Sequence, residues 1–279
     1  MKVINLKEAL LINNPFINKN ILFKTSNSII REFNEDKYGS IPKLLKDNPE
    51  YRLPDIERLE ISDSLIHIFH NNKHYKGSAK WLLEKIKSTI IDSYLRILKF
   101  KDFNSITEFG AGYGSKIITL MESNYNENIS SYFAVDISQN GLKACQELAK
   151  RIGKKVDIIQ HDFNTDLLSD LAKSNNTLLL TVYNLHYWKR FSIKEFLKFL
   201  DIGITGGIHI EPCSDLINSL EDKSYKDLVK EYIKKNDYAL NIAKPFIEAQ
   251  KMGYIHLEIK KEMEGSGFLP ASNLIWWKI

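Results

Sequence analysis

Apolar residues recur at two different spacings along the chain, and the spacing changes near residue 100. Before that position they repeat every three or four residues, which places apolar side chains on one face of a helix. Leu82, Ile86 and Ile90, for example, fall on a single helical face. We find no convincing strand in this part of the chain, and the pattern predicts helices over residues 6–12, 28–33, 54–70 and 78–98.

Beyond residue 100, short apolar runs alternate with amphipathic segments of helical period. This alternation is typical of β-α units built around a mostly parallel sheet. Strands are predicted over residues 105–109, 132–136, 156–160, 177–183 and 207–211. Helices are predicted between them over residues 115–123, 138–152, 165–173 and 193–200. We therefore divide the chain into a helical N-terminal region, residues 1–100, and an α/β domain, residues 101–279.

The end of the chain breaks this alternation. After helices over residues 225–252, interrupted at Pro245, come two apparent strands, "YIHLEIKKEM" and "SNLIWWKI", with only the loop "EGSGFLPA" between them. Strands joined by so short a loop pair antiparallel. The predicted fold class is α/β: a Rossmann-like, doubly wound, mostly parallel seven-stranded sheet with an antiparallel C-terminal hairpin, preceded by a helical N-terminal region.

Composition and charge narrow the class of protein. The chain has 279 residues, of which 43% are hydrophobic and 27% charged, as expected of a soluble globular protein. We find no apolar run long enough for a signal peptide or a membrane span. Cys145 and Cys213 lack the neighbouring ligands of a zinc site, so we expect reduced thiols in a cytoplasmic protein. The net charge of +4 and the scarcity of arginine make a nucleic-acid partner improbable.

The stretch "TEFGAGYGSKI", residues 107–117, carries the clearest chemical signal. It follows a predicted strand and opens a helix, so its amide groups and the positive end of the helix dipole should converge on a ligand. Its glycines run G-x-G-x-G, with Ser115 where a dinucleotide fingerprint has its last glycine. Glu108 places a carboxylate that would repel a pyrophosphate and attract an ammonium or sulfonium group.

This loop resembles the first motif of class I S-adenosylmethionine-dependent methyltransferases. Three further stretches match that family's motif series in the same order: "FAVDIS" ending the second strand, "HDF" after the third and "VYNLHYW" after the fourth. The terminal strand pair also matches the family's antiparallel seventh strand. The resemblance covers residues 100–279 and implies an enzyme whose cofactor is S-adenosyl-L-methionine.

The resemblance assigns a role to each matching position. Glu108 and the glycine loop would hold the methionine moiety, Asp136 would accept from both ribose hydroxyls, and Ile137 would pack on the adenine. Asp162 would meet the adenine amino group, although it could serve only as a helix cap. The implied cofactor-binding residues are Glu108, Phe109, Gly110, Ala111, Gly112, Gly114, Asp136, Ile137, Asp162, Phe163, Asn184 and Leu185.

The acceptor of the methyl group is less defined. The "NPPY" signature of enzymes that methylate nucleobases or amides is absent, and the corresponding "YNLHYW" is similar to a pattern of small-molecule and sugar O-methyltransferases. We therefore expect a hydroxyl of a small molecule or sugar as acceptor; an amine of a small molecule or peptide remains open. No acidic triplet indicates a metal site.

A hydroxyl acceptor needs a base, and three residues are candidates for it. His186 follows the fourth strand at the edge where the methyl group should lie. Glu211 and His209 share one face of the fifth strand by two-residue alternation, with His209 one step deeper. His209 could equally be a hydrogen-bonded core residue, and His186 could merely pack against Trp188.

The N-terminal region is expected to cap the site, carry substrate contacts or form a homodimer interface. The resemblance places the segment before its long helix over the cofactor as a lid, so Tyr75 and Lys76 are candidate lid residues, with Tyr187 from the "YNLHYW" stretch. Two other classes stay open at this stage: a nicotinamide-dependent Rossmann oxidoreductase, and an inactive protein of the same fold that serves as a binding scaffold.

Overall fold

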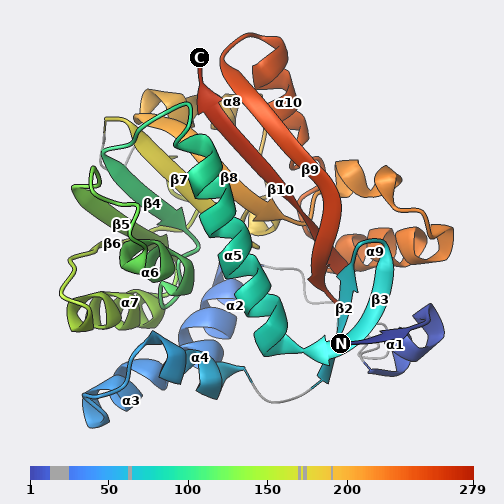
Figure 1. Cartoon of the computed structure of the whole chain (residues 1–279), viewed down its shortest axis with the longest axis horizontal. Helices are drawn as coiled ribbons and strands as arrows, with labels where there is room; N and C mark the ends of the chain where they lie inside the picture. The colour runs from blue at the N-terminus through green and yellow to red at the C-terminus, as the bar shows by residue number, and fades with distance from the viewer. Residues whose placement is uncertain (13–24, 62–64, 169–170, 172–174, 190) are drawn as a thin grey trace.

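The computed structural model describes residues 1–12, 25–61, 65–168, 171, 175–189 and 191–279. Within these residues ten strands form one sheet, in the order β1-β3-β2-β9-β10-β8-β7-β4-β5-β6. Figure 1 shows the sheet as a twisted layer that carries helices on both faces. The strands are β1 (Lys2–Ile4), β2 (Leu65–His70), β3 (Lys73–Ser78), β4 (Ser105–Phe109), β5 (Ser131–Asp136), β6 (Asp157–Gln160), β7 (Thr177–Val182), β8 (Ile204–Glu211), β9 (Ile255–Ser266) and β10 (Leu269–Lys278).

The strands from β4 to β10 confirm the predicted doubly wound sheet. The first five of them pair in parallel, and β10 lies antiparallel between β8 and β9. The sheet runs outward from β4 in both directions, through β5 on one side and β7 on the other. Ligands of doubly wound sheets bind at such a switch point, outside the carboxyl ends of the strands. The glycine loop that follows β4 is therefore where the fold directs a ligand.

Three hydrophobic clusters of the described residues pack between the sheet and its helices, and two of them lie on opposite faces of β7. Leu178 and Leu179 of β7 belong to different clusters because successive strand residues point to opposite faces. Leu178 packs with Ile117 of α6, whereas Leu179 packs with Phe196 of α8. None of the helices in the described part of the chain combines the length and apolarity needed to cross a bilayer. The α-helices are α1 (Leu6–Ile12), α2 (Ser26–Ile30), α3 (Ile41–Asp47), α4 (Leu53–Glu60), α5 (Ala79–Ile97), α6 (Ser115–Glu122), α7 (Gln139–Arg151), α8 (Ile193–Asp201), α9 (Lys223–Lys235) and α10 (Lys244–Lys251).

The N-terminal region also contains strands, which the periodicity did not predict. The predicted helix over residues 54–70 is wrong in its second half, because α4 ends at Glu60 and β2 begins at Leu65. Asn71 and Asn72 both adopt left-handed φ angles, 48° and 54°, and turn the chain back into β3. A two-residue turn of this kind is typical of β-hairpins. The hairpin extends the sheet beyond β9, and residues 62–64 lie outside the described residues.

The helix predicted over residues 165–173 also lies partly outside the described residues, and residues 163–165 form a turn. The terminal hairpin is longer than predicted, because most of the loop "EGSGFLPA" belongs to β9 and β10. The turn between these strands falls at Gly267, whose φ angle is 59°.

The N-terminal helices are fastened to α7 at both of its ends. At the start of α7, the Asn34 side-chain oxygen accepts hydrogen bonds from the Asn140 N–H (2.9 Å) and the Ser138 hydroxyl (3.2 Å). Asn34 lies in η1 (Arg31–Lys37), a π-helical continuation of α2. At the end of α7, the Arg151 guanidinium donates at 2.5, 3.0 and 2.6 Å to the carbonyls of Leu45, Asn48 and Tyr51. The Asn34 hydrogen bonds hold η1 against the loop that follows β5.

The buried Glu57 carboxylate fixes α4 to α5 through an ion pair and to the start of α6 through a hydrogen bond. The Glu57 carboxylate accepts from the Ser115 hydroxyl at 2.6 Å and from the Lys87 ammonium at 2.7 Å, and its side chain is 7% exposed. Because Ser115 is the first residue of α6, the glycine loop before it is braced from the N-terminal side. The N-terminal region is thus packed onto the end of the sheet where the glycine loop lies.

Candidate active site

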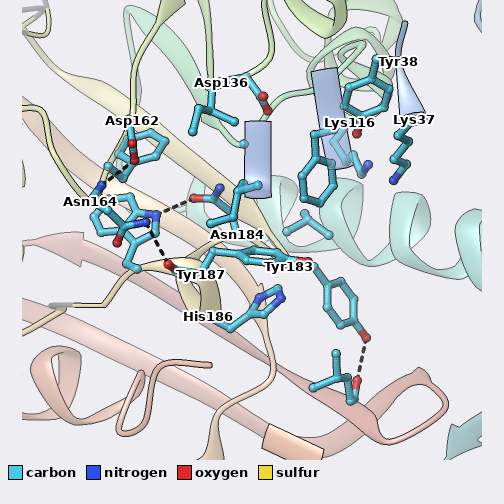
Figure 2. Close-up of a pocket in the computed structure, with 18 of the residues that line it drawn as sticks. Lys37, Tyr38, Lys116, Asp136, Asp162, Asn164, Tyr183, Asn184, His186 and Tyr187 are labelled. Carbon is cyan, nitrogen blue, oxygen red and sulfur yellow. Dashed lines mark hydrogen bonds between the residues drawn. The ribbon is translucent and has the colours of Figure 1, made fainter. Parts of the chain in front are cut away.

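A cavity of about 370 Å³ lies at the carboxyl ends of β4, β5 and β7 (Figure 2). This volume falls in the range of small-molecule sites, roughly 300–1,000 Å³. One wall comes from the strand ends, where Gly110, Asp136 and Asn184 lie. The opposite wall comes from the N-terminal region, through Phe33 and Lys37 of η1 and through α5. The cavity is therefore built jointly by the two parts of the chain.

The glycines of the loop are required by backbone conformation and by close neighbours. Gly110 and Gly112 adopt φ angles of 72° and 53°, which strain any residue with a side chain. A Cβ atom at Gly110 would lie 2.3 Å from the Asn184 amide nitrogen, and one at Gly112 would lie 2.5 Å from the Tyr38 hydroxyl. The loop therefore makes room for Asn184 on one side and for Tyr38 of the N-terminal region on the other.

The sequence led us to expect that the amide groups of the loop converge on a ligand. Three of these groups instead donate to other parts of the protein. The N–H groups of Gly110 and Ala111 both donate to the Val135 carbonyl, at 2.8 and 3.2 Å. The Gly112 N–H donates to the Asp136 carboxylate at 2.8 Å. These bonds tie the loop to β5, so at these positions it offers a close-fitting surface rather than hydrogen-bond donors.

Asp136 ends β5 at the cavity wall, in the position predicted for ribose binding. One carboxylate oxygen accepts from the Gly112 N–H and the other accepts from the Ser138 N–H at 2.7 Å. Burial raises the pKa of Asp136, and those two bonds together with Lys37 and Lys116 lower it. A carboxylate oxygen has two lone-pair sites, so each can still accept one ligand hydroxyl. A vicinal diol such as a ribose fits this arrangement.

Three further residues continue the wall beyond Asp136. Ile137, Asp162 and Phe163, which the sequence assigned to the adenine side, all line the cavity. Phe163 is held in place by stacking on Trp188, with ring centroids 4.4 Å apart. The Asp162 carboxylate also accepts from the Asn164 N–H at 2.9 Å, so it shapes its own turn as well as facing the cavity.

Glu108 does not reach the cavity, contrary to its predicted place beside the ligand. It is 1% exposed, and its carboxylate accepts from the Ile117 N–H at 2.9 Å in the first turn of α6. Burial raises the pKa of Glu108 to about 8, although Lys116 and the Ile117 N–H lower it. Five other predicted positions also lie behind the lining residues: Phe109, Ala111, Gly112, Gly114 and Leu185.

The buried Glu108 leads to a prediction about stability. On folding, the pKa of Glu108 rises from 4.5 to about 8. The carboxyl group therefore makes its full contribution to the unfolding free energy below pH 4.5, and this contribution is lost as the pH rises through 8. Glu108→Gln has no carboxyl group to lose a proton. Between pH 5 and pH 9 the unfolding free energy of the parent protein should therefore fall, relative to that of the variant, by on the order of 3 kcal/mol. Urea denaturation at both pH values measures the difference. Glu84→Gln, an exposed change on α5, is the control, and parallel pH curves for Glu108→Gln and the parent would rule out the raised pKa.

The chain leaves β7 through a strained residue. Tyr183 has a φ angle of 51°, a rare conformation for a bulky side chain, and its hydroxyl donates to the Leu269 carbonyl at 3.0 Å. The next N–H group, that of Asn184, donates to both Glu211 carboxylate oxygens, at 2.9 and 3.1 Å. Such strain persists only where the surroundings hold it, and it is frequent at functional sites. Together these contacts set the path of residues 184–187 into the cavity wall.

His186 and Glu211 come together at this wall. The imidazole Nδ1 lies 3.5 Å from a Glu211 carboxylate oxygen, and the two side chains are 3% and 0% exposed. His186 and Tyr187 line the cavity, and the His186 ring packs against the rings of Tyr187 and Tyr238 at 4.2 and 4.6 Å. Figure 2 shows His186 below Tyr183 and Tyr187 at one end of the cavity.

His209 lies in the core rather than at the site. Its Nε2 accepts from the Trp276 indole at 2.8 Å, and its Nδ1 lies 2.9 Å from the Thr181 hydroxyl. Burial lowers the pKa of His209 to about 3, so this ring stays neutral. The structure therefore corrects the inclusion of His209 among the candidate bases: strand alternation placed it on the correct face but could not show its depth.

Of the three candidate lid residues, Tyr187 lines the cavity and the other two lie elsewhere. Tyr75 and Lys76 lie on β3, in register with β1 and β2, and neither lines the cavity. The covering residues are Phe33, Lys37 and Tyr38, which the sequence did not single out. Tyr38 packs against Tyr113 of the glycine loop with ring centroids 5.8 Å apart. No local motif marks these residues, because their role depends on contacts with a loop about 75 positions away.

Comparisons with known proteins found a matching family model and similar solved structures. Residues 68–185 match the family model described as histidine-specific methyltransferase, SAM-dependent. The solved structure of magnesium protoporphyrin IX methyltransferase (ChlM) from Synechocystis PCC 6803 with bound SAH is similar over 91% of this chain and 100% of that one, with a TM-score of 0.53 and 9% identity. The solved structure of the plantazolicin methyltransferase BpumL with a desmethylPZN analog and SAH is similar over 91% of this chain and 98% of that one. Its TM-score is 0.47 and its sequence identity is 12%. No curated protein sequence matches.

The doubly wound sheet, the motif series and the family match define the class of protein. Residues 68–185 match a family of S-adenosylmethionine-dependent methyltransferases, and the chain has the class I methyltransferase fold, which indicates S-adenosylmethionine as its cofactor. That match favours a methyltransferase over the nicotinamide-dependent oxidoreductase and the inactive scaffold that the sequence left open.

Proposed function

We propose that this enzyme methylates a hydroxyl group of a small molecule and that His186 takes the hydroxyl proton. The observation that carries the proposal is the buried pair of His186 and Glu211 in the cavity wall, 3.5 Å apart. A carboxylate beside one imidazole nitrogen orients the ring and stabilises the charge that forms when the other nitrogen takes a proton. A hydroxyl is a weak nucleophile, so a base of this kind has a clear use.

The cofactor fits the residues at the other end of the cavity. When bound, S-adenosylmethionine supplies an electrophilic methyl group on a sulfonium. Asp136 would accept from its ribose hydroxyls, while Ile137 and Phe163 would pack beside its adenine. As the acceptor oxygen bonds to the methyl carbon and the sulfur–carbon bond breaks, the hydroxyl proton would pass to His186. Most of the rate then comes from holding the acceptor in line and excluding water.

The N-terminal region, residues 1–100, would serve this reaction as a cap. Three observations support that role: Phe33 and Lys37 line the cavity, Tyr38 packs on the glycine loop, and Asn34 bonds to the start of α7. A closed cap excludes water from the reacting groups.

A second candidate acceptor is an amine of histidine or a related molecule. The description of the matching family model favours it. That match ends at residue 185, however, and so does not include His186, Glu211 or the C-terminal segments around the cavity. An amine would also need no base as strong as the His186 and Glu211 pair.

Acceptor screening tests the proposal. The purified enzyme is incubated with S-adenosylmethionine and separate panels of hydroxyl compounds and amines, L-histidine among them. Release of S-adenosylhomocysteine and the mass of the methylated product are measured. We expect turnover with at least one hydroxyl compound and a mass gain on oxygen. Methylation restricted to amines would replace this proposal with the second candidate.

A further inference from the structure

Four charged side chains among the described residues line the cavity, and Lys37 and Lys116 lie together on one side of it, away from Asp162. Burial raises the pKa of Asp136, and the charges of Lys37 and Lys116 lower it. Figure 2 shows Lys37 and Lys116 on the side away from His186. This end can meet the charged methionine part of the cofactor, which leaves the His186 end for the acceptor.

The wall near the His186 end is largely apolar. Phe33 of η1 and Leu269 of β10 contact Tyr187 and Tyr183 there, and Leu83 and Ile86 of α5 also line the cavity. Tyr183 and Tyr187 add two aromatic rings, and Phe33 meets Tyr187 edge to face, with centroids 5.6 Å apart. Aromatic rings favour edge-to-face and offset-stacked partners. A flat ring would find such partners on this wall.

The polar groups at this end already have partners within the protein. The Tyr183 hydroxyl donates to the Leu269 carbonyl, and the Tyr187 hydroxyl is hydrogen-bonded to that of Tyr238. The Asn164 side chain donates to the Tyr187 carbonyl at 3.2 Å and accepts from the Lys189 N–H at 2.8 Å. The Asn184 side-chain oxygen accepts from the Trp188 indole at 3.0 Å.

His186 differs from these groups. Its Nδ1 is buried and has no hydrogen-bond partner among the described residues, although the Glu211 carboxylate lies 3.5 Å away. Because Nδ1 faces Glu211, the other ring nitrogen, Nε2, is the one left to meet a ligand hydroxyl. A ligand with several hydroxyls would leave most of them without a partner, and an unpaired buried hydroxyl is unfavourable.

We infer that the acceptor is a phenol: a flat, mostly apolar molecule whose single hydroxyl, carried by an aromatic ring, meets His186. This inference rests on the proposed function and replaces the sugar acceptor expected from the sequence. The chemistry agrees, because a phenol titrates near ~10 and gives up its proton to an imidazole more readily than an aliphatic hydroxyl does. In the transfer, the phenol oxygen bonds to the methyl carbon, the sulfur–carbon bond breaks, and the phenol proton moves to His186.

A comparison of 2-naphthol, glucose and L-histidine as acceptors tests the inference. We expect kcat/KM for 2-naphthol to exceed that for glucose by roughly 10- to 100-fold, because the apolar wall leaves sugar hydroxyls unpaired. Faster methylation of glucose would overturn the aromatic acceptor and leave O-methylation standing. Methylation of L-histidine alone would overturn both. If no probe is methylated, calorimetry with the S-adenosylhomocysteine complex decides, and equal binding of 2-naphthol and glucose would reject the inference.

A variant of the wall gives an independent readout. Ile86→Asn places an amide in the apolar wall and should raise KM for 2-naphthol about 10-fold, while the Kd of S-adenosylhomocysteine is unchanged. Ser88→Asn introduces the same amide at an exposed position of α5 and should change neither value. An unaltered KM in folded Ile86→Asn would show that this wall does not contact the acceptor.

Discussion

Replacing His186 with alanine should lower kcat for a hydroxyl acceptor by roughly 10²- to 10⁴-fold. The loss follows from removing the group that takes the proton as the new bond forms. The Kd of S-adenosylmethionine should change little, because the proposed cofactor contacts lie at the Asp136 end of the cavity. Steady-state kinetics with saturating acceptor gives kcat, and calorimetry gives the Kd.

A second variant separates the base from its partner. Glu211→Gln keeps an oxygen that can accept from the Asn184 N–H but removes the charge beside the imidazole. We expect it to lower kcat less than His186→Ala does, with the kcat against pH profile displaced. Normal turnover in His186→Ala with loss in Glu211→Gln would assign the base to Glu211. Normal turnover in both would favour an amine or an already ionised oxygen, and the role of His186 as the base would be wrong.

The sequence predicted the parts of the fold whose signals are local. β4 and α1 match their predicted bounds, the end of β5 at Asp136 was placed correctly, and the end of β7 lies one residue before its predicted position. Each of these elements is short, and its apolar period or its glycines decide its conformation almost alone. The "NN" pair of the β2–β3 hairpin was a readable local signal as well, since both residues are left-handed in the turn.

The remaining features of the site depend on tertiary contacts. Glu108 stands beside the glycine loop in sequence, but whether its carboxylate faces a ligand or the start of α6 depends on how the loop folds. His209 and Glu211 share a strand face, and only Trp276 and Thr181, from other strands, place His209 in the core. Tyr38 covers Gly112 from 74 positions away. Side-chain direction at such distances is not encoded in periodicity.

Asp136→Ala should weaken binding of S-adenosylhomocysteine by roughly 1 to 3 kcal/mol, or about 5- to 150-fold in Kd. The ribose hydroxyls lose a charged acceptor in this variant. The change also leaves the Gly112 and Ser138 N–H groups without their partner, so a loosened loop could give the same loss. Calorimetry at 25 °C measures the affinity, and Asp157→Ala, at an exposed position of β6, is the control.

A modified ligand distinguishes the two causes. The 2′,3′-dideoxy analogue of S-adenosylhomocysteine lacks the hydroxyls that Asp136 should bind, so it should bind the parent protein more weakly than S-adenosylhomocysteine does. In Asp136→Ala the two ligands should bind nearly equally, because the acceptor is absent from the protein side as well. If Asp136→Ala weakens both ligands by the same factor, Asp136 acts only by shaping the loop. If it weakens neither, the ribose is held elsewhere and the orientation of the cofactor in this cavity must be different.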